Sequence, residues 1–186
     1  MSEKPTIFTV GHSTRSFDEL VGIVKAHSVV AIADVRAFPR SRRHPHFNDD
    51  ALARELPRAG IEYLPFKSLG GHRKARSDSI HTAWRNDSFR GYADYMQSPA
   101  FESALDELMH AARERSTTIM CAEAVPWRCH RSLIADALLV RGWDVRDIMD
   151  ANAARPHELP KFAIVNGATI EYRGEANPAE PNLFNL

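Results

Sequence analysis

The chain has 186 residues, of which 44% are hydrophobic and 26% are charged, and these fractions are close to those of ordinary globular proteins. They exclude a collagen-like, coiled-coil or disordered chain. The 24 lysines and arginines balance the 24 aspartates and glutamates, so any basic binding site has to be local. At this length we expect one domain with additions.

No stretch approaches the roughly 18 consecutive apolar residues of a membrane-spanning helix, and the first residues lack the apolar segment of a signal peptide. We therefore expect a cytoplasmic protein with no membrane partner. Cys121 and Cys129 are the only cysteines, which excludes a disulfide framework. In a reducing compartment such thiols are structural, catalytic or metal-binding rather than bridged.

The first part of the chain alternates between strand and helix patterns. Residues 6–10 form a short β-rich run, and Ser16 with Glu19 has the spacing of a capping box at the start of a helix. Residues 29–35 are almost continuously apolar, as in a parallel strand buried on both faces. Asn48 is placed to cap a helix over residues 51–59, and residues 61–66 predict the third strand.

The second part continues this alternation after a long polar segment. Residues 67–86 contain glycines and basic residues without an apolar period, and loops of this length are usually functional or mobile. Beyond them, the apolar spacing predicts helices over residues 89–96, from Ser98-Pro99 onward, and over Leu133 to Leu138 before Gly142. Strands are predicted over residues 117–121 and 144–148.

Alternation of this kind predicts an α/β fold with an open, mainly parallel sheet and helices on both of its faces, a Rossmann-like three-layer arrangement. Residues 162–172, centred on Asn166-Gly167, predict an added C-terminal β-hairpin. We expect a single domain over residues 1–172 and a flexible tail over residues 173–186.

Polar residues gather where the predicted strands end, and ligands of open parallel sheets bind at the carboxyl ends of the strands. This convergence is the strongest functional indication in the sequence. The residues concerned are Gly11, His12, Ser13 and Arg15 after the first strand, Asp34, Arg36, Arg40, Arg42 and Arg43 after the second, Gly70, Gly71, His72, Arg73, Lys74 and Arg76 after the third, and Cys121, Glu123, Cys129, His130 and Arg131 after the fourth.

The segment from Cys121 to Arg131 is the richest of these groups. It places a thiol at a strand end, a carboxylate two residues later, and an imidazole and a guanidinium at the start of a helix, where backbone N–H groups favour anions and lower the pKa of a thiol. The layout resembles the active sites of rhodaneses and cysteine phosphatases in architecture only, because the arginine spacing differs. The alternative is that Cys121 is an inert buried thiol and that Glu123 forms a structural ion pair.

Two other binding chemistries follow from these groups. Arginines cluster between Arg36 and Arg43, and a second basic group follows from His72 to Arg76; arginine forks grip phosphate groups bidentately. A solvated charged surface is the alternative. Zinc binding is an alternative for Cys121, Glu123, Cys129 and His130, but it is the weaker one, because the cysteines lack a C-x-x-C pair and a second pair of ligands.

Several motifs, in order along the chain, resemble the bacterial family catalogued as domain of unknown function 488. They are VGHSTRS at 10–16, ADVRAFPRSRRHPHF at 33–47, LGGHR at 69–73, RGYADYM at 90–96, and CAE with CHRS at 121–132, so the likeness covers about residues 6–148. The resemblance implies the α/β fold and candidate positions rather than a reaction. It adds Tyr92 to the site residues given above.

The sequence thus predicts an enzyme that acts on a nucleotide, nucleoside or nucleic-acid base by hydrolysis or group transfer, without a cofactor. Glu123 and His130 would move protons, Cys121 is a candidate nucleophile and Arg131 would stabilise negative charge, with His12 beside them. The expected partner is a phosphate-bearing small molecule or a nucleic acid. The alternatives are a non-catalytic nucleic-acid-binding module and a thiol-based sulfurtransferase or phosphatase-like enzyme.

Overall fold

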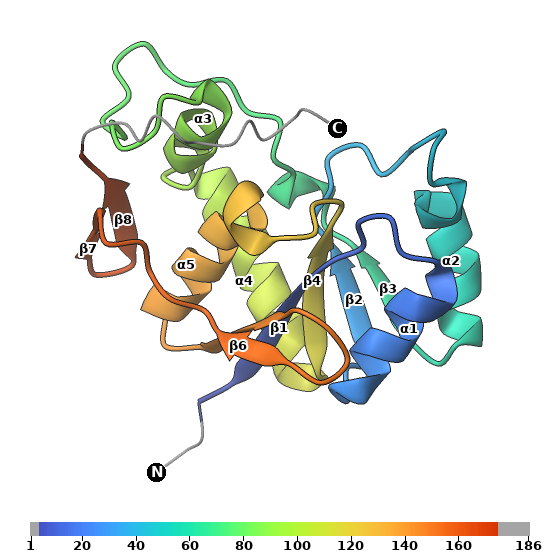
Figure 1. Cartoon of the computed structure of the whole chain (residues 1–186). Helices are drawn as coiled ribbons and strands as arrows, with labels where there is room; N and C mark the ends of the chain where they lie inside the picture. Colours follow the sequence, from blue (N-terminus) through green and yellow to red (C-terminus); the bar gives the residue numbers. More distant parts are fainter. Residues whose placement is uncertain (1–3, 175–186) are drawn as a thin grey trace.

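A central sheet of six strands runs in the order β3-β2-β4-β1-β5-β6 in the computed structural model, which describes residues 4–174 (Figure 1). The first five strands are parallel and β6 is antiparallel to β5. The strands are β1 (Thr6–Gly11), β2 (Ala31–Asp34), β3 (Glu62–Pro65), β4 (Thr117–Cys121), β5 (Asp144–Ile148) and β6 (Ala154–Pro156).

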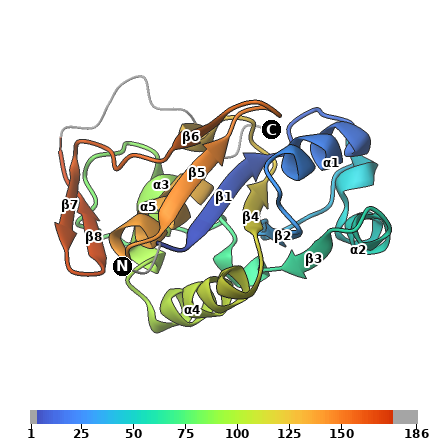
Figure 2. The same cartoon turned by 90° about the horizontal axis from the view of Figure 1, so that it is seen from below.

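Helices cover both faces of this sheet, as Figure 2 shows. One apolar core lies between the sheet and the helices α1 (Phe17–Ala26) and α2 (Asp49–Arg58). The other core is larger and lies under α3 (Asp87–Tyr95), α4 (Pro99–Glu114) and α5 (Arg131–Val140). The predicted three-layer α/β fold with a mainly parallel sheet is therefore confirmed.

Helix starts follow local hydrogen bonding. The Ser16 hydroxyl accepts from the backbone N–H of Glu19 at 3.1 Å, and the Glu19 carboxylate accepts from the backbone of Ser16 at 2.7 Å, which confirms the predicted capping box. Asn48 occupies the predicted N-cap position of α2, but its side chain makes no capping hydrogen bond. Its oxygen accepts instead from the backbone N–H of Ser41 at 2.7 Å, because the preceding loop folds back over the helix start.

The C-terminal part contains one expected and one unexpected element. The hairpin of β7 (Ala163–Asn166) and β8 (Thr169–Tyr172) is confirmed, with Gly167 in the left-handed conformation that its turn requires. Strand β6 was not predicted, since three residues are too short to show a period. Short 3-10 turns complete the description: η1 (Pro45–Phe47), η2 (Lys67–Leu69) and η3 (Pro126–Arg128).

Two further expectations concern the ends and the surroundings of the chain. Of the tail predicted over residues 173–186, only Arg173 and Gly174 lie within the described residues. Among the helices of residues 4–174, none combines the length and the apolar character that crossing a membrane requires.

Candidate functional site

The carboxyl ends of β1 and β4 lie side by side where the chain leaves for opposite helical layers, the position of the ligand crevice in many open α/β sheets. Here the ends are joined directly. The backbone N–H of His12 donates to the carbonyl of Cys121, and that of Ser13 donates to the next carbonyl, both at 2.9 Å. A Cβ atom on Gly11 would lie 1.8 Å from the carbonyl oxygen of Glu123, so only glycine fits this junction.

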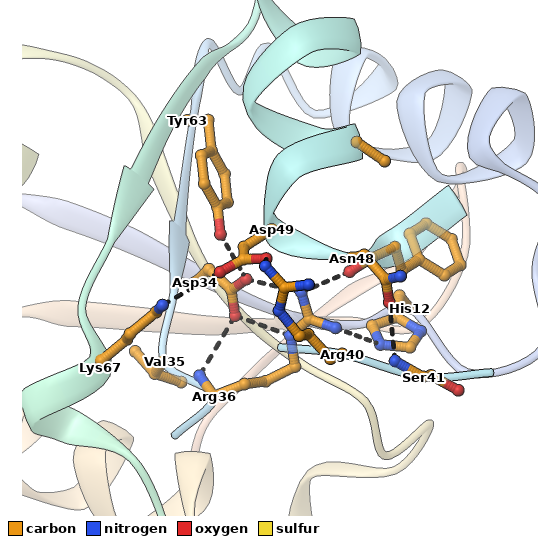
Figure 3. A network of polar contacts seen from close by, with 12 residues as sticks. His12, Asp34, Val35, Arg36, Arg40, Ser41, Asn48, Asp49, Tyr63 and Lys67 are labelled. Atoms are coloured by element: carbon orange, nitrogen blue, oxygen red, sulfur yellow. Dashed lines mark hydrogen bonds and ion pairs between the residues drawn. The ribbon is translucent and has the colours of Figure 1, made fainter. Parts of the chain in front are cut away.

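Arg36, just beyond β2, is the centre of a buried polar network (Figure 3). Its Nε and Nη2 atoms donate to the two oxygens of Asp34 at 2.8 and 2.6 Å, and Nη2 also donates to the carbonyl of Phe47 at 2.8 Å. The Tyr63 hydroxyl donates to the same carboxylate at 2.9 Å, and burial together with that negative charge raises the pKa of Tyr63. The guanidinium of Arg36 is thereby held by protein acceptors.

His12 lies against this network as a neutral imidazole. Because an arginine N–H can only donate, the 3.2 Å contact between Arg36 Nη1 and His12 Nε2 makes Nε2 the acceptor. The ring proton is then on Nδ1, which donates to the carbonyl of Ser13 at 2.9 Å. Burial and the charge of Arg36 lower the pKa of His12 to about 3. Any proton transfer by His12 would therefore start from the uncharged ring.

The other predicted phosphate-binding arginines differ in how far they are engaged by the protein. Arg15 donates to carbonyls of β1 and of the segment after β5 at 2.5 and 3.2 Å, and Arg73 donates to carbonyls of its own loop at 2.8 and 3.2 Å. Arg40 is 71% exposed and lies 3.4 Å from Asp49. The side chain of Arg43 is also exposed. The loop over residues 36–47, called the arginine loop below, thus carries two of the predicted phosphate-binding arginines, Arg40 and Arg43, with their side chains facing solvent.

Gly70, Gly71 and Tyr92 pack the segment after β3 onto this edge of the sheet. A Cβ atom on Gly71 would lie 2.6 Å from the ring of His130, and one on Gly70 would lie 2.6 Å from the backbone of Ala37. Tyr92 is fully buried in α3 and donates its hydroxyl to a carbonyl of η2 at 2.7 Å. These contacts give all three residues a packing role.

Arg131 is buried at the start of α5 and holds the loop that follows β4. Its Nη1 atom donates to the sulfur of Cys121 at 2.8 Å and to the carbonyl of Glu123 at 2.5 Å, and Nε donates to the Thr9 hydroxyl at 3.4 Å. Cys121 is 2% exposed, and burial raises the pKa of its thiol well above the usual value. Glu123 is half-buried, and its carboxylate accepts from the backbone N–H of Ala124 at 2.9 Å.

Cys129 has a different environment from Cys121. Its sulfur lies 3.5 Å from His130 Nδ1 and accepts from the backbone N–H of Arg131 at 3.5 Å. Burial opposes ionisation of Cys129, but the hydrogen bond from the Cys121 thiol and the charge of Arg131 together lower its pKa. His130 Nε2 donates to the carbonyl of Val35 at 2.9 Å, so Nδ1 faces the sulfur as an acceptor. The Cys129 thiol can therefore donate to this nitrogen, although Cys129 is only 4% exposed.

A cavity of about 790 Å³ lies beside α5, at the carboxyl ends of β4 and β5. Its apolar wall contains Trp84, Phe89 and Phe162, and its wall toward the sheet contains Asp136, Asp147 and His157. The rings of Trp84 and Phe89 are stacked with centroids 5.3 Å apart, and Phe162 stands edge-on to Trp84 at 5.4 Å. Trp127 also lines the cavity and is 61% exposed.

His157 lies between two carboxylates in the wall of this cavity. Nδ1 is 2.9 Å from Asp147 and Nε2 is 2.8 Å from Asp136. Burial alone would lower the pKa of His157, but these two hydrogen bonds outweigh it and raise the pKa to about 9. The carboxylates are held in turn, Asp136 by the Tyr172 hydroxyl at 2.9 Å and Asp147 by the Thr9 hydroxyl at 2.6 Å. At neutral pH the wall thus contains a protonated imidazole between two fixed carboxylates.

This group could not be predicted from the sequence, because its members come from α5, β5 and the segment after β6. A signal was present, since Asp136 interrupts the apolar face of a helix and Asp147 lies inside a strand, where burial demands a partner. Which partner each would find depends on the fold. No group of His, Cys, Asp and Glu side chains in the described part of the chain is arranged to hold a metal ion.

Comparison with known proteins gives one result. The family described as "Domain of unknown function DUF488" matches residues 16–138, which include the arginine loop, α3, α4 and most of α5. Comparisons with curated proteins and with solved structures return no match.

Proposed function

The chain belongs to the family described as "Domain of unknown function DUF488", and for this member we propose an enzyme that acts on a nucleotide, nucleoside or nucleic-acid base. The reaction would be a hydrolysis or a group transfer in the cavity beside α5. One observation carries this proposal: the His157 ring lies between two carboxylates in the wall of a large apolar cavity, and these contacts raise the pKa of His157 to about 9. Ionisable groups with perturbed pKa values in a cavity are characteristic of active sites.

The cavity suits a planar heterocycle. Its volume of about 790 Å³ falls within the range of small-molecule sites. Trp84, Phe89 and Phe162 offer flat apolar surfaces on which a base can stack. The opposite wall offers carboxylate oxygens that can accept hydrogen bonds from the N–H groups of a base.

The polar wall supplies the groups that acid–base catalysis needs. In a hydrolysis, one carboxylate would accept a proton from the attacking water. The imidazolium of His157 would exchange one of its two carboxylate partners for the leaving group and supply it with a proton. Asp136 and Asp147 are fixed by Tyr172 and Thr9, so the proton carriers are already oriented.

Titration with free nucleosides tests this proposal. We expect adenosine, guanosine, cytidine or uridine to quench the tryptophan fluorescence, because Trp84 and Trp127 line the cavity. Chromatography of the products should show a released base or a transferred group. Replacing Trp84→Ala should weaken binding about tenfold, as expected for loss of one stacking surface.

Variants at His157 separate chemistry from binding. His157→Gln should reduce turnover by about 10²-fold or more while nucleoside binding changes little, because it removes the proton but keeps a polar side chain. His110→Gln, on the exposed face of α4, is the matched control and should retain full turnover. Circular dichroism shows whether each variant is folded. Absence of both binding and turnover in the wild type, or full turnover in a folded His157→Gln variant, would refute the proposal.

A further inference from the structure

We propose that the loop over residues 36–47 binds the backbone of a single-stranded nucleic acid. This inference rests on the proposed function, because it makes a polynucleotide, rather than a free nucleoside, the substrate whose base enters the cavity. It also makes a prediction about binding that can be tested without any turnover.

The loop over residues 36–47 presents positive charge to solvent. The side chains of Arg42 and Arg43 are exposed. Within residues 4–174 neither side chain makes a hydrogen bond or an ion pair, and Arg43 is bonded only through its backbone N–H. Arg40 is 71% exposed and shares Asp49 with Lys67, whose ammonium lies 3.0 Å from that carboxylate. One carboxylate therefore serves two cations, and the loop keeps positive charge for a ligand. Phosphate groups spaced along a strand match several arginines on one loop.

Hydrogen bonds within the protein order this loop before it binds a ligand. Asn48 accepts from the backbone N–H of Ser41 at 2.7 Å, a contact visible in Figure 3. The Ser41 hydroxyl accepts from the backbone N–H groups of Arg43 and His44 at 3.2 and 3.1 Å. The side chain predicted to cap α2 is thus used to hold the arginine loop. A preorganised loop loses less conformational freedom on binding than a flexible one.

The same loop also carries an exposed aromatic ring. Phe38 is 74% exposed, and its ring is edge-on to His72 with centroids 5.2 Å apart. Arginines next to an exposed aromatic side chain are the combination that binds unpaired bases and their backbone together. The bases of a duplex are already stacked on one another, so this surface favours a single strand.

The loop and the segment over residues 122–128 lie along the same edge of the sheet (Figure 1). That segment carries Trp127, which is 61% exposed and lines the cavity, and the exposed Arg128. A strand bound at the arginine loop can therefore continue past Trp127 and present a base to the cavity.

The test is fluorescence anisotropy with a labelled single-stranded oligonucleotide of about 16 nucleotides and with the corresponding duplex, at several salt concentrations. We expect the wild type to prefer the single strand. The double variant Arg42→Ala/Arg43→Ala should bind it about tenfold more weakly, and the slope of log K against log salt should fall by about 1.4, or 0.7 for each lost phosphate contact. Phe38→Ala should lose about tenfold in single-strand affinity while duplex binding stays the same.

The matched control is Arg54→Ala/Arg58→Ala on α2, where the two side chains are 58% and 68% exposed. This control removes the same charge, so an equal loss in both double variants would mean nonspecific attraction and would overturn the proposal. So would oligonucleotide binding that is unchanged in Arg42→Ala/Arg43→Ala, or a Phe38→Ala variant that keeps its preference for single strands. Nucleoside turnover by the arginine-loop variant reports on the cavity alone and separates failure of this inference from failure of the proposed enzyme.

Discussion

Arg36 shows how the surroundings of a residue decide what its side chain can do. Its sequence context, a run of arginines after a buried strand, favours phosphate binding. In the fold its guanidinium is instead bound by Asp34, His12 and the carbonyl of Phe47, and its side chain is only 10% exposed. A buried arginine held in this way orders the ends of β1 and β2. The exposed arginines a few residues later are left to meet a ligand.

His12 is expected to make the protein sensitive to acid. Its pKa is about 3 in the folded protein and about 6.5 when the chain is unfolded, so the unfolded chain binds the extra proton between these values. The free energy of unfolding should therefore fall as the pH falls from about 6.5 toward 3. We expect the Tm of His12→Gln to fall less than that of the wild type over this range, because glutamine can still accept from Arg36 and does not titrate.

Thermal unfolding followed by circular dichroism between pH 7 and pH 4 checks this expectation. His110→Gln removes an exposed histidine and should leave the acid dependence of the wild type unchanged. An equally steep fall in His12→Gln would mean that other groups cause the loss of stability in acid.

At the scale of helices and strands, prediction succeeded where the determining contacts are local. The capping box of Ser16 and Glu19 and the turn at Gly167 each depend on residues a few positions apart. Asn48 has the right residue type for a cap, but its partner is Ser41 in a loop whose path is set by tertiary packing. The cavity wall is a stronger case, because Asp136 meets its partners only after α5, β5 and the hairpin have come together.

Gly11 is the point where the ends of β1 and β4 meet most closely. Replacing it by alanine would put a Cβ atom 1.8 Å from the carbonyl oxygen of Glu123, and backbone cannot move aside as a flexible side chain can. We expect Gly11→Ala to lower the free energy of unfolding by about 3 kcal/mol or more, from overpacking.

Gly22→Ala in α1 is the control: nothing lies within 4 Å of its Cβ position, so it should be neutral or stabilise by about 0.5–1 kcal/mol. Urea unfolding measures both, and equal stability of the two variants would contradict this account of the junction.

At the scale of the whole molecule, a continuous polar layer lies beneath α5 and links the two ends of the candidate site. Arg131 contacts Cys121 and Thr9, Thr9 contacts Asp147, and His157 joins Asp147 to α5. Asp136 then contacts Tyr172 of β8, so the layer extends from the loop after β4 to the hairpin. Opposite charges alternate along it, which is the arrangement that makes buried ions tolerable. His157 therefore joins β5 to α5 through its proton, and Tyr172 joins α5 to the hairpin.

Loss of that proton should loosen the molecule at alkaline pH. The folded pKa of His157, about 9, lies above its unfolded value of about 6.5, so its stabilisation is complete below pH 6.5 and is lost as the pH rises through 9. At roughly 1.4 kcal/mol per pKa unit this amounts to about 3 kcal/mol, or a fall in Tm of roughly 5–10 °C. His157→Gln cannot carry the proton, so its Tm should change little between pH 6.5 and pH 9. Because buried carboxylates without a cation repel each other, the Tm of the wild type should approach that of the variant above pH 9. A wild-type Tm that stays constant from pH 6.5 to pH 10 would show that the imidazole between Asp136 and Asp147 does not hold its proton in the folded state.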